Sequence, residues 1–183
     1  MLITFAVYVE NRPGVLNRVA SLFRRRGFNI ESLTVGHTEK RGVSRMTIVV
    51  ETDENGAQRL EANLYKLVNV LRVDNITSKP SVVRDLAMIK VATTPESRSE
   101  LMQLVNVFRA RVVDVAADSL VIETTGAEDK IDSLLDVLRP YGVIEMVRTG
   151  RVAIARGPKA TEQSATGSTE VANTAGESVS YSV

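Results

Sequence analysis

The chain has 183 residues, of which 44% are hydrophobic and 25% are charged, the composition of a protein that buries a core. Its 23 lysines and arginines are balanced by 22 aspartates and glutamates, which argues against a nucleic-acid-binding or membrane-surface protein. The absence of cysteine excludes disulfides and thiolate metal sites, and no apolar run reaches the roughly 18 residues of a transmembrane helix.

The first part of the chain alternates strand and helix patterns. Runs of alternating or β-branched residues predict four strands, at residues 2–10, 28–35, 43–51 and 70–76. A helix is expected from Pro13, which suits a first helical position, to a stop at Gly27. A second helix follows the turn at 53–56 and is expected to carry on one side Leu60, Leu64, Leu67 and Val68.

The same order recurs after a linker expected at 77–82. Four further strands are predicted at 83–91, 111–115, 120–124 and 143–147. Apolar residues at i, i+3, i+4 and i+7 predict helices at 96–110 and 127–139. A divergent duplication and two unrelated modules of the same topology both explain this recurrence.

The fold class is therefore expected to be α+β, with two tandem ferredoxin-like βαββαβ modules. We expect the first module at 1–77 and the second at 83–157. Residues 158–183 are rich in Ser, Thr, Ala, Gly and Glu and have no apolar periodicity, which predicts a disordered tail.

The turn at residues 11–14 is the most informative local feature, because it leads from a strand into a helix N-terminus. The first N–H groups of a helix lack internal partners and favour negative charge, so a carboxylate is a natural ligand there. Gly14 lets the backbone come close to a ligand, Val15 and Leu16 add apolar surface, and the Asn11 amide could bind an ammonium group. On composition alone, an ordinary capped turn is the more common explanation.

A family resemblance adds to this interpretation. ENRPGVLNRVASLFRRRGFNIESLTV at 10–35 resembles the start of an ACT domain, a module that typically senses amino acids. With SRMTIVVE at 44–51 and LYKLVNVLRV at 64–73, it resembles more narrowly the regulatory small subunit of acetolactate (acetohydroxyacid) synthase. RDLAMIKV at 84–91 and RPYG at 139–142 are similar to the C-terminal domain of that family.

The resemblance implies a chain without catalytic residues that binds a separate large catalytic subunit, activates it and confers feedback inhibition by a branched-chain amino acid, usually valine. The catalytic subunit would hold thiamine diphosphate, FAD and Mg²⁺, and this chain no cofactor or metal. The resemblance also implies a homodimer through the ACT domains, with the effector at their interface. The effector-binding residues would be Asn11, Gly14, Val15 and Leu16 of one chain and Asn29 and Ile30 of the other.

Two other functions are alternatives for a chain of this kind. A free-standing ACT-type amino-acid sensor or transcriptional regulator would normally need a DNA-binding element, and neither a helix-turn-helix pattern nor a basic stripe is visible. An enzyme on this fold would need converging ionisable groups, and the sequence offers no Ser/His/Asp arrangement and no phosphate-binding loop. We expect no nucleic-acid or membrane partner.

Smaller features have simpler explanations. His37, the single histidine, lies in a polar turn and is expected to be solvated. The arginines at 24–26 suit a helix C-terminus, with a contact to the catalytic subunit as the alternative. The chain begins without a signal-peptide pattern, so a bacterial cytoplasmic protein is expected, and a processed plastid protein fits as well.

Overall fold

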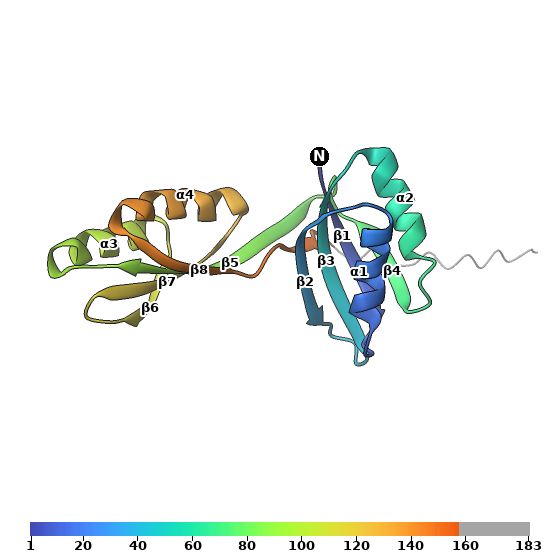
Figure 1. Ribbon diagram of the computed structural model, residues 1–183, viewed down its shortest axis with the longest axis horizontal. Coiled ribbons are helices and arrows are strands. Elements are labelled where there is room, and N and C mark those ends of the chain that lie inside the picture. The colour runs from blue at the N-terminus through green and yellow to red at the C-terminus, as the bar shows by residue number, and fades with distance from the viewer. Residues whose placement is uncertain (158–183) are drawn as a thin grey trace, which may run out of the picture.

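The computed structural model describes residues 1–157, which form two sheets that each carry helices on one face (Figure 1). The first module consists of β1 (Leu2–Glu10), α1 (Val15–Arg25), β2 (Ile30–His37), β3 (Val43–Glu51), α2 (Glu54–Leu64) and β4 (Val70–Asn75). The second consists of β5 (Ser81–Ala92), α3 (Pro95–Val107), β6 (Arg111–Val115), β7 (Ser119–Gly126), α4 (Glu128–Leu138), the 3-10 turn η1 (Arg139–Tyr141), β8 (Val143–Arg148) and β9 (Val152–Ala155). The expected tail at 158–183 lies outside the described residues.

The first sheet has the strand order β2-β3-β1-β4, and every neighbouring pair is antiparallel. The alternating side chains of β1 form its core with exposures of 2% or less: Ile3, Phe5, Val7 and Val9. They pack against α1 and α2, and the burial of this apolar surface is the main source of stability. The α+β, ferredoxin-like arrangement is thus confirmed for this module.

The second sheet has the corresponding order β6-β7-β5-β8, with α3 and α4 on one face (Figure 1). Its core joins residues of the two central strands to one face of each helix: Ile89, Val91, Leu101, Val105, Leu120, Ile122, Leu134 and Leu138. The two modules therefore share a topology and bury separate cores.

The connection between the modules differs from the expected linker. β5 begins at Ser81, and its first four residues pair with β9, a strand that the sequence pattern did not indicate. The rest of β5 pairs with β7 and β8, so a single strand runs from one module into the other. Ala153 of β9 is 1% exposed and packs against Ala6 and Ile76 on the helix-free face of the first sheet. A paired ribbon therefore joins the modules.

Several element ends also differ from the predictions. Pro13 precedes α1, which begins at Val15. α2 ends at Leu64, so Val68 lies in the following turn with 92% exposure, and its predicted place on the apolar helix face is wrong. α3 ends at Val107, since Arg109 adopts a left-handed φ of 51° that a helix cannot continue through. Within the part described, none of the helices combines the length and apolar character of a membrane span.

The end of α2 gives a direct test of this packing. Leu64 is completely buried, so Leu64→Ala is expected to lower the free energy of unfolding by about 2–5 kcal/mol, because it leaves a cavity. Val68→Ala changes a side chain that already contacts water and is expected to alter stability by no more than about 0.5 kcal/mol. Chemical denaturation checks both values, and a similar loss in the two variants would contradict the observed end of the helix.

Candidate functional site

The β1–α1 turn has a backbone conformation that requires glycine. The Val15 N–H donates to the Arg12 carbonyl over 3.4 Å, and Gly14 has φ 81° and ψ −7°, the values of the third residue in a type II turn. Any other residue would be strained there by about 1–2 kcal/mol. A Cβ added at Gly14 would meet nothing within 4 Å, so the space beside this glycine is open.

The start of α1 has donors without internal acceptors. No side chain caps the helix, its first turn contains no acidic residue, and its backbone ladder begins with Arg18 N–H to Gly14 carbonyl, 3.1 Å. The N–H groups of Leu16 and Asn17 lie within this first turn, at the positive end of the helix dipole, where an anion is favoured. This geometry suits a small carboxylate.

The two apolar residues of the turn have different environments. Val15 is 4% exposed and packs in the core, whereas Leu16 is 43% exposed at the surface. Leu16 is therefore the side chain of the pair that offers apolar surface to a ligand.

Asn11 lies beside a residue that no local sequence pattern connects with it. The Asn11 backbone N–H donates to the Gly42 carbonyl over 2.8 Å, and its exposed side-chain amide nitrogen lies 3.4 Å from Nδ1 of His37. His37 ends β2, two strands away from β1, so this proximity depends on the strand order. His37 is exposed, and it belongs to the surroundings of the turn.

The predicted residues Asn29 and Ile30 lie at the other end of the sheet. Ile30 is level with Val50, which pairs with Ile3 at the start of β1, whereas the turn follows the far end of β1 at Glu10. Seven residues of strand separate the two positions, about 23 Å. The six predicted residues therefore form two groups that a small ligand cannot bridge within one chain.

The second group has its own local contacts. Asn29 is exposed, and its amide nitrogen donates to Oε1 of Glu31 over 2.5 Å, while Ile30 is half-buried against the core. Asn29 directly precedes β2 and Ile30 begins it, and β2 is an edge strand of the sheet. The outer edge of such a strand presents backbone groups that can pair with a further strand.

The arginines at the end of α1 have local partners. Arg25 donates to the Ser21 carbonyl over 3.3 Å, and Arg26 donates to Oδ1 of Asn63 on α2 over 2.9 Å. These contacts and the helix dipole account for the placement of both residues.

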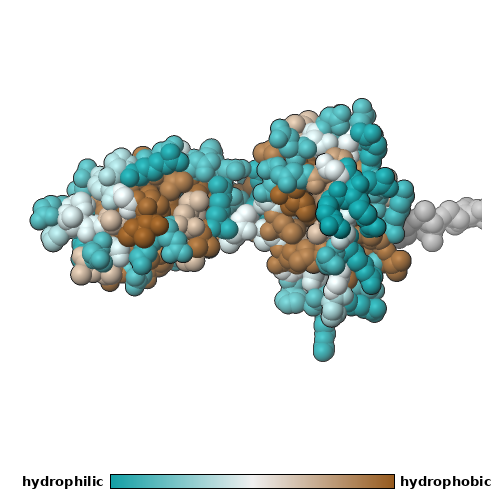
Figure 2. All heavy atoms as spheres, in the orientation of Figure 1, coloured by the Kyte–Doolittle hydropathy of each residue, from teal (hydrophilic) through white to brown (hydrophobic). Residues whose placement is uncertain are grey.

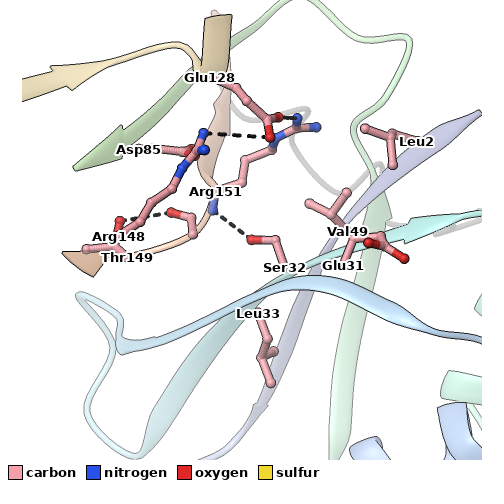
Figure 3. A pocket seen from close by; sticks show the side chains of 11 residues that line it. Leu2, Glu31, Ser32, Leu33, Val49, Asp85, Glu128, Arg148, Thr149 and Arg151 are labelled. Carbon is pink, nitrogen blue, oxygen red and sulfur yellow. Dashed lines mark hydrogen bonds and ion pairs between the residues drawn. The ribbon is translucent and has the colours of Figure 1, made fainter. Parts of the chain in front are cut away.

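A cavity of about 430 Å³ lies away from the turn, between the two modules (Figure 3). Its lining comes from β1, β2 and β3 on one side and from β5, α4 and the segment after β8 on the other. Glu128, Arg148 and Arg151 point toward one another there. Among residues 1–157, His, Asp and Glu side chains do not gather in threes at any potential metal site.

Both modules match known families. Residues 5–72 match the AHAS small subunit-like ACT domain, and residues 84–157 match the small subunit of acetolactate synthase. The probable acetolactate synthase small subunit of Archaeoglobus fulgidus is 55% identical over 156 residues, covering 85% of this chain and 98% of that protein. The acetolactate synthase small subunit of Bacillus subtilis is 50% identical over 150 residues, covering 81% and 87%.

The structure shows the same relationship. The crystal structure of the acetolactate synthase small subunit from Thermotoga maritima is similar with a TM-score of 0.81 and 39% sequence identity, and the match covers 86% of this chain and 99% of that one. The family matches together include most of both modules. The chain therefore belongs to the acetolactate synthase small-subunit family.

Proposed function

We propose that this chain is the non-catalytic regulatory subunit of an acetolactate synthase in the cytoplasm. It binds a separate catalytic subunit, raises the activity of that subunit and makes it sensitive to valine or a related branched-chain amino acid. Thiamine diphosphate, FAD and Mg²⁺ belong to the catalytic subunit in this proposal. The observation that supports it most strongly is the uncapped N-terminus of α1 behind a glycine turn, in a chain of this family.

Valine fits the chemistry of the turn. Its carboxylate would accept from the N–H groups of Leu16 and Asn17, where the helix dipole favours negative charge. Its ammonium group would donate to the side-chain oxygen of Asn11, and its isopropyl group would lie against exposed Leu16. These contacts leave one side of the ligand uncovered, which a second copy of the chain would close.

The strand order explains how a second copy would do this. β2 and β1 are parallel, because both are antiparallel to β3, and His37 is level with Val9 near the turn. Antiparallel pairing of β2 with β2 of a second copy, centred between Leu33 and Thr34, would set Ile30 of one copy opposite His37 of the other. Asn29 and Ile30 of the second copy would then lie beside the turn.

A ligand shared in this way has two effects. It stabilises the homodimer, since it binds the paired form better than the separate chains. It can also change the activity of the catalytic subunit. For this, the ligand must bind two arrangements of the complex with different affinities. A site that lies between two chains can meet this condition through a change in how the chains pair.

The proposed function is tested by mixing the purified chain with the catalytic subunit and measuring acetolactate formation with and without valine. We expect the chain to stimulate the reaction, to be inactive alone and to make the mixture sensitive to valine. Valine binding without stimulation would indicate a free-standing sensor, and a failure of both would refute the proposal.

The shared site is tested by two variants. Gly14→Asp places a carboxylate where that of valine binds, and Asn29→His replaces the amide supplied by the second copy. Each is expected to raise the valine concentration for half-inhibition at least about tenfold, a loss of 1.4 kcal/mol, while retaining stimulation.

Mixing the two variants gives a sharper result. In a mixed dimer, one site contains both substitutions and the other contains neither, because each site takes the turn from one chain and β2 from the other. Random mixing is therefore expected to restore about a quarter of the wild-type valine sites, measured by calorimetry. If both groups acted within a single chain, mixing would restore none.

A further inference from the structure

The segment that follows β8 passes from one module to the other within three residues. The Thr149 N–H donates to the Leu86 carbonyl of β5 over 3.0 Å. Two residues later, the Arg151 N–H donates to Oγ of Ser32 on β2 over 2.8 Å (Figure 3). The Arg151 carbonyl accepts from Oγ1 of Thr34 over 3.1 Å. The crossing segment, residues 149–151, is thus held by β2 on one side and β5 on the other.

The Arg151 side chain joins the same two modules. This side chain is 19% exposed. Its guanidinium donates from Nη1 to Oγ1 of Thr4 on β1 over 3.2 Å and from Nη2 to Oε2 of Glu128 over 2.9 Å. Glu128 is the first residue of α4, where the helix dipole favours a carboxylate. A planar guanidinium that makes two directed hydrogen bonds fixes the orientation of its two partners more strictly than a single ammonium group does.

Arg148 holds Glu128 from the second module. Its Nη2 lies 3.6 Å from Oε1 of Glu128 and 2.7 Å from Oδ2 of Asp85, and its Nη1 lies 3.2 Å from Oδ1 of Asp132. Burial opposes the charged form of Arg148, but the hydrogen bond to Asp85 and the neighbouring carboxylates outweigh it and raise the pKa. Glu128 therefore lies between an arginine tied to its own module and one tied to the first sheet.

Gly150 shows how closely the crossing segment approaches β2. Its φ is 84°, and a Cβ there would lie 2.7 Å from Oγ of Ser32 and 3.4 Å from Oγ1 of Thr34. A single methyl group would therefore displace the Ser32 hydroxyl, which accepts the hydrogen bond from the Arg151 N–H. The contact depends on glycine for both its conformation and its space.

β2 connects these contacts to the proposed effector site. It begins at Ile30, and Ser32 and Thr34 follow two and four residues later on the same strand. We propose that the crossing segment transmits a ligand-dependent shift of β2 to α4, with Gly150, Arg151 and Glu128 as positioning residues for valine inhibition. This inference rests on the function proposed above and adds the route by which the effector site acts on the second module.

The narrow junction makes these contacts decisive for the relative placement of the modules. In the space-filling view, the two modules meet at a waist much thinner than either of them (Figure 2). The contacts across it, besides the β5–β9 ribbon, are largely polar and directed. A movement of Ser32 and Thr34 would therefore carry Arg151 with it, and Glu128 would follow.

The test uses the full chain in complex with the catalytic subunit. Three variants interrupt the route at different points: Gly150→Ala, Arg151→Met and Glu128→Gln. Each variant is expected to bind valine with a dissociation constant within about twofold of wild type. Each is also expected to require at least about fivefold more valine for half-inhibition, because a factor of about five is the lower end of common allosteric coupling factors. Calorimetry on the free subunit and inhibition of the complex separate the two quantities.

A double-mutant cycle tests whether Arg151 and Glu128 act through one bond. If they do, Arg151→Met with Glu128→Gln weakens inhibition no more than the stronger single variant. Additive losses would assign the two residues to separate roles and overturn the proposed route.

Two matched controls accompany these variants. Gly157 has φ 85° and open space around its Cβ position, so Gly157→Ala reproduces the backbone strain of Gly150→Ala without the clash. Arg111 pairs with Glu123 inside the second module, so Arg111→Met removes an ion pair that does not join modules. Both controls are expected to keep the wild-type valine response.

The outcomes separate this inference from the proposed function. A wild-type complex that the chain does not stimulate and that ignores valine would refute the proposed function. A wild-type complex that responds, with three variants that respond like the controls, would overturn the route alone. If Arg151→Met fails to fold, Arg151→Lys takes its place, because lysine keeps the charge and lacks the planar guanidinium. This variant is expected to show a partial loss of inhibition at an unchanged melting temperature. Full inhibition in that variant would also overturn the route.

Discussion

The antiparallel pairing of β3 with both β1 and β2 is the constraint on which the rest of this structure depends. It makes β1 and β2 parallel, and it fixes Ile30 level with Ile3 while the turn follows Glu10. The helix start that can accept a carboxylate and the strand start that carries Asn29 therefore lie at opposite ends of one sheet. The same arrangement leaves β2 at an edge, where a second copy in the reverse direction would bring the two ends together. In the proposed arrangement, dimerisation and effector binding would both follow from this one set of strand pairings.

The chemistry of the turn is suited to regulation because each of its contacts is modest. If an amino acid binds here as proposed, backbone N–H groups at a helix start, one exposed amide and one exposed leucine would give directed but weak binding, and the ligand would remain in exchange with its cellular pool. A feedback signal needs this reversibility. The specificity for an α-amino acid would come from the fixed distance between the helix start and Asn11, and the choice among aliphatic side chains from Leu16 and the second copy.

Much of the fold could be predicted from local patterns, because strong periodicity marks elements whose faces are buried. The alternation in β1 and the apolar faces of α3 and α4 are examples. The misses have physical causes: Val68 continues a helical spacing after the helix has ended, and β9 is four residues long and pairs with a strand about 70 residues earlier. The resemblance indicated both groups of site residues, but their separation within a chain emerged only from the register. The contact of His37 with Asn11 and the bridge made by Arg151 link residues distant in sequence, and no local pattern indicates them.

The way the modules are joined decides whether a ligand on one can affect the other. A flexible linker would let the second module ignore a movement in the first, since nothing would bias its position. A large apolar interface would hold one arrangement too firmly for a small ligand to change it. The observed junction lies between these limits: the β5–β9 ribbon restricts the modules, and a few polar contacts set their placement. In the proposed mechanism, an effector bound beside β2 would act by changing these contacts, and allosteric couplings are commonly worth about 1–3 kcal/mol.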